Sequence, residues 1–83
     1  MADPNLFAQA ISFHRAGRLN EAEAAYRAIL TDEPGHADSL HLLGVVAHQK
    51  GNHIDAVSLI QQAIGLQPGV LNTTVYLLGA MSE

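Results

Sequence analysis

Apolar residues recur every three or four positions along most of the chain, the spacing that gathers them on one face of an α-helix. The first such stripe consists of Leu6, Ala10 and Phe13, with Phe7, Ile11 and His14 beside it. Asp3 can cap the start of this helix, and Pro4 fits its first turn, where a missing N–H donor is harmless. Gly17 predicts its end, because glycine readily adopts the left-handed conformation that follows many helices.

A second helix is predicted to begin at Asn20, which Glu23 follows three residues later in the arrangement of a capping box. Its buried stripe is expected to hold Ala22, Tyr26, Ile29 and Leu30. Residues 31–35 have the sequence Thr-Asp-Glu-Pro-Gly, which breaks a helix because proline restricts the residue before it. The first 35 residues thus predict a hairpin of two helices.

The same order of signals returns in the second half of the chain. A third helix, which Gly51 ends, is expected to place Leu40, Leu43, Gly44 and Ala47 on one face. Asn52 and Asp55 can cap a fourth helix, which Pro68 and Gly69 close. The apolar positions of that helix are Ala56, Leu59, Ile60, Ala63 and Ile64.

An internal repeat relates the two hairpins. A shift of 34 positions aligns Leu6 with Leu40, His14 with His48, Gly17 with Gly51, Ala22 with Ala56, Pro34 with Pro68, and Gly35 with Gly69. A period of this length built from two helices resembles the tetratricopeptide repeat.

The second unit fits the pattern of that family best. Leu40 stands in the usual tryptophan slot, Leu43 and Gly44 form the Leu-Gly pair, Ala47 takes the tyrosine slot, and Ala56, Ile60 and Pro68 complete the unit. The first unit carries Leu6, Ala10, Phe13, Ala22, Tyr26 and Pro34 in the corresponding slots. It departs from the pattern at Gln9, where leucine is usual, and this weakens the expected inner packing of the first unit.

The resemblance implies an all-α solenoid of five helices in a single domain. We expect repeat 1 over about residues 3–36, repeat 2 over about residues 37–70, and a partial third repeat or capping helix over residues 71–83. Gly44 or Ala10 on one helix is expected to face Ala22 or Ala56 on its partner. Such small residues let two helix axes approach to within about 8–10 Å.

The expected fifth helix is apolar around most of its circumference, unlike the polar terminal helix of a typical solenoid. Its oligomerisation residues are expected to be Val75, Tyr76, Leu77, Leu78 and Met81. Because no second helix follows it, we expect another copy of the chain to cover this surface, through end-to-end stacking or exchange of the last helix. The alternative is a monomer in which this helix folds back on the fourth.

The resemblance also implies a concave groove, lined by the first helix of each unit, for an extended peptide or a partner helix. Carried over by position, the groove residues are Phe7, Ile11, His14, Arg15, His41, Val45, His48 and Gln49. The alternative is that Phe7, Ile11 and Val45 only pack against adjacent helices. Some members clamp a terminal carboxylate with Lys, Arg and Asn from several first helices, but this is not expected here, because only Arg15 and Lys50 are nearby and both lie at helix ends.

Charge and composition narrow the partners. Four basic residues stand against eight acidic ones, and the basic residues are scattered, which argues against nucleic acid and anionic membranes. The chain has no cysteine, no apolar stretch long enough to span a bilayer and no visible signal peptide, so we expect a cytoplasmic protein.

Recognisable chemistry is missing from the sequence. No catalytic triad, nucleophile elbow or phosphate-binding glycine loop occurs, so no enzymatic activity and no cofactor are expected. Asp38 and His41 lie one helical turn apart, but no third helical ligand follows, and His48 lies about 10 Å from His41 along a helix. No metal site is therefore predicted. Five histidines do predict that any assembly changes between about pH 8 and about pH 5.5.

These observations predict a non-enzymatic module for protein–protein interaction or scaffolding, whose partners are a protein or peptide and further copies of itself. The rival interpretation is an accessory segment, because the opening half also resembles the repeats that precede glycosyltransferase or methyltransferase domains in bacteria.

Overall fold

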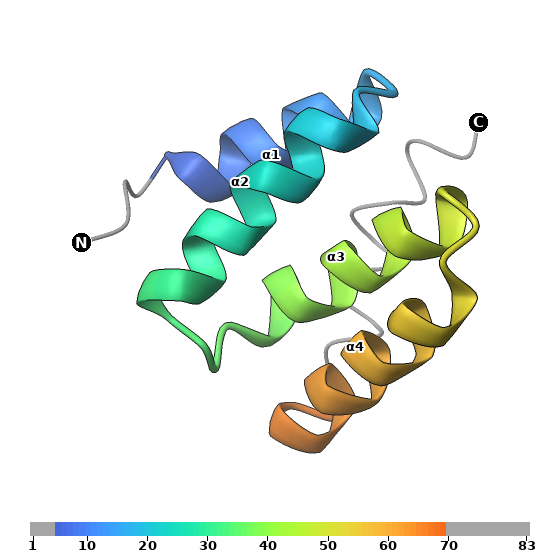
Figure 1. Ribbon diagram of the computed structural model, residues 1–83. Helices are drawn as coiled ribbons and strands as arrows, with labels where there is room; N and C mark the ends of the chain where they lie inside the picture. The colour runs from blue at the N-terminus through green and yellow to red at the C-terminus, as the bar shows by residue number, and fades with distance from the viewer. Residues whose placement is uncertain (1–4, 70–83) are drawn as a thin grey trace.

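Four α-helices make up residues 5–69, the part of the chain that the computed structural model describes, and no strand occurs among them (Figure 1). The helices are α1 (Leu6–Arg15), α2 (Leu19–Asp32), α3 (Ala37–Gln49) and α4 (His53–Leu66). Consecutive helices pack against each other, so α1 and α2 form one hairpin and α3 and α4 a second. The four helices expected in this range are confirmed. The expected fifth helix, with its oligomerisation residues, lies outside the described residues, as do Asp3 and Pro4.

Glycine ends the first helix of each hairpin as predicted. Gly17 and Gly51 have φ values of 79° and 89°, in the left-handed region that side chains with a Cβ rarely adopt. After α1 the Gly17 N–H donates to the His14 carbonyl at 3.1 Å, and the Arg18 N–H donates to the Phe13 carbonyl at 2.8 Å. These two bonds form a Schellman motif, which satisfies carbonyls that the helix leaves free. The same pair of bonds recurs after α3.

The starts of the helices correct the predicted capping. Helix α2 begins at Leu19 rather than at Asn20, with Arg18 in the capping position, so the capping box of Asn20 and Glu23 is wrong. Asn20 and Glu23 instead face another part of the chain and accept hydrogen bonds from the Lys50 ammonium, each at 2.7 Å. Asn52 does precede α4, but its side chain makes no capping bond.

His36 caps α3, a role that the sequence did not reveal. Its Nδ1 atom accepts a hydrogen bond from the Ser39 N–H at 3.2 Å. The preferred capping residues are serine, threonine, asparagine and aspartate, so a histidine in this position gives no capping signal. One of the five histidines thus has a local structural role.

Helix α3 is the most deeply buried element, with nine of its 13 residues buried. It packs against both α2 and α4, and this explains why apolar residues on more than one of its faces are enclosed. The predicted face of α3 is buried, and Leu42 and Val46 are fully buried in addition. In the first hairpin Ala10, Ala22 and Tyr26 are fully buried, so the core of the described chain runs through both hairpins.

Close approach of α3 and α4 depends on Gly44. A Cβ atom at this position would lie 2.7 Å from Ile60 Cγ1 and 3.2 Å from the Ala56 carbonyl oxygen, both on α4. The expected pairing of Gly44 with Ala56 is therefore confirmed. The absent side chain lets the backbone of one helix contact the other directly.

An ion pair joins the end of α3 to the first hairpin. The Lys50 ammonium lies 2.7 Å from the Glu23 carboxylate, and Arg27 reaches the same carboxylate at 3.0 Å from one turn along α2. The hydrogen bond from Lys50, followed by that from Arg27, lowers the pKa of Glu23. Together they hold the turn after α3 against α2.

No helix within residues 5–69 is both long and apolar enough to cross a membrane.

Candidate functional site

The expected groove residues of α1 differ in their surroundings. Phe7 is half-buried and packs against the core, with its ring centroid 6.4 Å from that of Tyr26 and 5.1 Å from that of His36. Ile11 is also half-buried, whereas Arg15 is exposed. Ile11 packs against the same core as Phe7, and Arg15 is the most accessible of the three.

His14 is a structural residue that connects three helices. It is 5% exposed, and its Nε2 atom lies 2.7 Å from the Gln49 amide oxygen, while its Nδ1 atom lies 3.2 Å from the Tyr26 hydroxyl. A carbonyl oxygen only accepts, so the Nε2–H of neutral His14 donates to Gln49, and the Tyr26 O–H donates to Nδ1. Helix α1 is thereby bound to α2 and α3. We infer that His14 and Gln49 stabilise the packing of the two hairpins.

Acidification is expected to weaken the fold at His14. Burial lowers the pKa of His14 below its ordinary value of 6.5, against the opposing effect of the hydrogen bond to Gln49. The unfolded chain therefore takes up this proton at a higher pH than the folded chain. Stability from neutral His14 is complete above the ordinary pKa and is lost progressively as the pH falls below it. The urea midpoint of the chain should drop between about pH 8 and about pH 5.5.

Two variants identify the residue responsible. The His14→Gln variant should be less stable at about pH 8 and should lose less of its remaining stability on acidification, because its side chain does not titrate. His53→Gln removes a histidine at an exposed position and should change the drop less than His14→Gln does. An equal drop in the natural chain and in His14→Gln would assign the effect to other groups.

The expected groove residues of α3 also differ in their exposure. His41 is buried, and burial lowers its pKa while the charge of Asp38 opposes that shift. Val45 is half-buried and His48 is exposed. His48 lies against His53, across the turn between α3 and α4. The eight expected residues thus do not form one continuous open surface, because His14 and His41 are enclosed.

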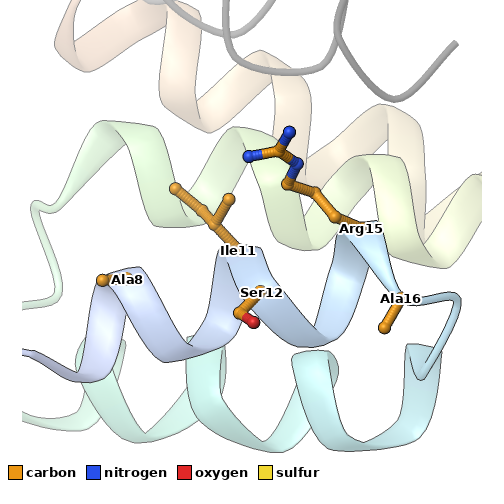
Figure 2. A pocket seen from close by; sticks show the side chains of 5 residues that line it. All are labelled: Ala8, Ile11, Ser12, Arg15 and Ala16. Carbon is orange, nitrogen blue, oxygen red and sulfur yellow. The ribbon is translucent and has the colours of Figure 1, made fainter. Parts of the chain in front are cut away.

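A hollow lies on the side of α1. It has a volume of about 560 Å³ and is lined by Ala8, Ile11, Ser12, Arg15 and Ala16 (Figure 2). Figure 2 shows the side chains of Ile11 and Arg15 extending to the same side of the helix, one turn apart. The three small side chains leave the space beside them open.

Sequence reasoning identified two of the five lining residues, Ile11 and Arg15. It missed Ala8, Ser12 and Ala16, which recur every four residues and therefore share one face of the helix. A stripe of small residues on an exposed helix face was the available signal. Such a stripe predicts a helix-packing contact as readily as an open surface, so it does not identify the hollow by itself.

Arg15 carries an unneutralised charge. Its guanidinium makes no hydrogen bond or ion pair in the described structure, whereas the other three cationic side chains pair with carboxylates. Arg18 pairs with Glu21, and both Arg27 and Lys50 pair with Glu23. The hollow therefore combines the apolar side chain of Ile11 with Arg15, the cationic side chain that has no partner within residues 5–69.

A second hollow is less suited to a charged partner. It has a volume of about 350 Å³ and lies between α2, α3 and α4, lined by Arg27, Leu30, Thr31, Leu43 and Leu59. The Arg27 guanidinium there is already engaged by Glu23, at 3.0 Å. A ligand carboxylate would have to compete with that ion pair.

No group of three or more histidine, cysteine, aspartate or glutamate side chains converges anywhere in the described range.

Known proteins resemble the chain over most of its length. The sequence model of the tetratricopeptide repeat matches residues 7–70. A peroxisomal targeting signal receptor of Kluyveromyces lactis is 29% identical over 69 residues, which cover 82% of this chain. The matched segment is only 12% of the length of that receptor. No solved structure matches the chain significantly.

Proposed function

Because the chain belongs to the tetratricopeptide repeat family, we propose that it is a non-enzymatic module that binds a segment of another protein in the hollow on α1. The observation that carries this proposal is the position of Arg15, a cation that no side chain of residues 5–69 neutralises, one helical turn from the half-buried Ile11. We expect the partner to place an apolar side chain over Ile11 and a carboxylate against Arg15.

The size of the hollow favours a short segment. Ligand sites commonly have volumes of about 300–1,000 Å³, and this hollow lies within that range. A guanidinium can bind a carboxylate through two parallel hydrogen bonds, which gives direction as well as energy. The partner class is therefore a peptide with an acidic side chain or a free C-terminal carboxylate next to an apolar residue.

The similarity to a receptor for a targeting signal supports a ligand made of protein. The chain matches only a small part of that receptor. A targeting signal as the ligand of this chain is therefore part of what we propose. If the chain is instead an accessory segment of a larger enzyme, the hollow would bind a segment of that enzyme or of its substrate protein.

Selection from a display library of short random peptides with free C-terminal carboxylates tests this proposal. Peptides that bind the natural chain should be enriched in acidic groups beside apolar residues. The Arg15→Glu variant should bind them at least about tenfold more weakly, because hydrogen bonds between charged groups contribute about 1.5–3 kcal/mol. Ile11→Ser should also weaken binding. Fluorescence anisotropy with the selected peptides measures both effects.

Arg18→Glu is the matched control. It makes the same change of charge three residues away, at a side chain that pairs with Glu21 and does not line the hollow. This variant should bind the selected peptides like the natural chain. If Arg15→Glu and Arg18→Glu weakened binding equally, or if neither did, the hollow would not be the binding site.

Self-association is a second candidate function, and exposed apolar residues on α4 favour it. Ile54 is 87% exposed and Val57 is 55% exposed, and they lie one helical turn apart. A second copy of the chain that covers them would remove this apolar surface from water. Light scattering after size exclusion should show an oligomer that the substitution Ile54→Lys converts to a monomer. A monomeric natural chain at high concentration would exclude self-association.

A further inference from the structure

The turn between α3 and α4 brings two histidines into contact. His48 lies in the last turn of α3 and His53 is the first residue of α4, and their Nδ1 atoms are 3.0 Å apart. The ring centroids are 4.8 Å apart, with the planes inclined at 59°. Both side chains are exposed, so an ion can reach both rings without opening the fold.

The backbone holds this pair in place. The Gly51 N–H donates to the His48 carbonyl at 3.0 Å, and the Asn52 N–H donates to the Ala47 carbonyl at 2.8 Å. With its φ of 89°, Gly51 completes a Schellman motif that reverses the chain between the two rings. The backbone between His48 and His53 is therefore already ordered. Binding of a common ligand would cost less conformational entropy for this reason.

The distance between the two nitrogens is that of two ligands on one metal ion. Imidazole nitrogens bind late transition metals at about 2.0–2.1 Å. Two such nitrogens lie about 2.9 Å apart when their bonds to the metal form a right angle, and about 3.3 Å apart in a tetrahedral site. We propose that His48 and His53, whose Nδ1 atoms are already within the range of two ligands on one ion, chelate a divalent late transition metal ion such as Cu²⁺ or Ni²⁺.

The rings must rotate to bind a common metal ion. In the metal-free pair one Nδ1 atom donates a hydrogen to the other, so the two rings are directed at each other. A metal ion replaces that hydrogen and requires both lone pairs to point at a common site beside the pair. Exposed side chains can make this rotation freely.

Nearby charges permit a cation at this turn. The Lys50 ammonium lies in the same turn, but Glu23 and Asn20 hold it against α2, each at 2.7 Å. The adjacent Glu23 carboxylate offsets its charge. No third histidine, cysteine or carboxylate joins the pair within the described range, so the remaining coordination positions are open to water or to a group from a partner.

The first repeat provides an internal comparison. The positions equivalent to His48 and His53 are His14 and Leu19, so that turn has the same backbone motif but a single histidine. His14 is also buried and engaged by Tyr26 and Gln49. Chelation is therefore expected at the second turn and not at the first.

Calorimetric titration of the full chain with Ni²⁺ alone, in a buffer that does not bind metals, tests the proposal. We expect one ion per chain, complete reversal by EDTA, and a higher unfolding temperature in the presence of the ion, because binding to the folded chain stabilises it. His48→Gln and His53→Gln should each abolish this site. Circular dichroism verifies that both variants remain folded.

A composition-matched variant separates the pair from a general effect of histidines. The double change His53→Gln and Gln62→His keeps five histidines and the net charge, but moves one ring to an exposed position further along α4. It should lose the site as completely as His53→Gln. One ion per two chains, still lost in these variants, would also support the pair and would assign the open positions to a second copy. Equal binding by the natural chain and the matched variant, or no binding by the natural chain, would overturn the proposal.

Discussion

Replacing Tyr26 with alanine is expected to lower the free energy of unfolding by at least about 3–5 kcal/mol, a large part of the total stability of a small domain. The side chain is fully buried between the two hairpins, with its ring centroid 6.4 Å from that of Phe7 and 6.0 Å from that of His14. Removing a buried aromatic side chain costs about 3–5 kcal/mol, and small domains have total stabilities of about 5–15 kcal/mol. The lost hydrogen bond to His14 adds to this cost because it leaves a buried acceptor unpaired.

Tyr26→Phe separates the two contributions. It keeps the ring and removes only the hydroxyl that donates to His14, so we expect a loss of about 1 kcal/mol in the free energy of unfolding. For a domain of this size, that loss lowers the unfolding temperature by about 4–8 °C. Circular dichroism during thermal and urea unfolding measures both variants. A Tyr26→Ala variant as stable as the natural chain would mean that the hairpins do not pack on this ring.

The substitution Gly44→Val is expected to have the second largest effect. Its Cβ atom would lie 2.7 Å from Ile60 Cγ1 and 3.2 Å from the Ala56 carbonyl oxygen. The Ile60 side chain can rotate, but the carbonyl belongs to the backbone of α4 and can move only if the helices separate. Overpacking of this kind costs about 1–3 kcal/mol, which exceeds the helix propensity of about 0.5 kcal/mol gained over glycine.

Gly65→Val is the matched control for this packing. Gly65 also lies in a helix, but a Cβ atom there would have no neighbour within 4 Å. We expect its free energy of unfolding to stay within about 0.5 kcal/mol of that of the natural chain. Urea unfolding compares the two variants under the same conditions. Equal stabilities would show that α3 and α4 are not in close contact at Gly44.

The helical architecture was predictable because its signals are local and repeated. The left-handed conformation of Gly17 and Gly51 and the burial of Tyr26 follow from the spacing of apolar residues and from the 34-residue period. The start of α2 was misassigned because Asn20 and Glu23 have the spacing of a capping box, yet pair with Lys50 from the next repeat. A local sequence pattern cannot reveal a hydrogen bond between residues that lie 30 positions apart.

The candidate site was only partly predictable for the same reason. Position within the repeat identified Ile11 and Arg15, but it also placed His14 in the groove. Burial of His14 depends on Tyr26, 12 residues away, and on Gln49, 35 residues away. The free charge of Arg15 depends in turn on which carboxylates the other cations reach. Both properties arise from contacts between helices.

Mapping a selected peptide onto the chain by NMR tests the binding proposal most directly. Amide shifts in a ¹⁵N-labelled chain should change mainly along residues 8–16 when the peptide is added, and Arg15→Glu should abolish these changes. Arg18→Glu should leave them intact. Shift changes confined to α4 or to the turn after α3, with residues 8–16 unaffected, would contradict the assignment of the hollow on α1 as the partner site.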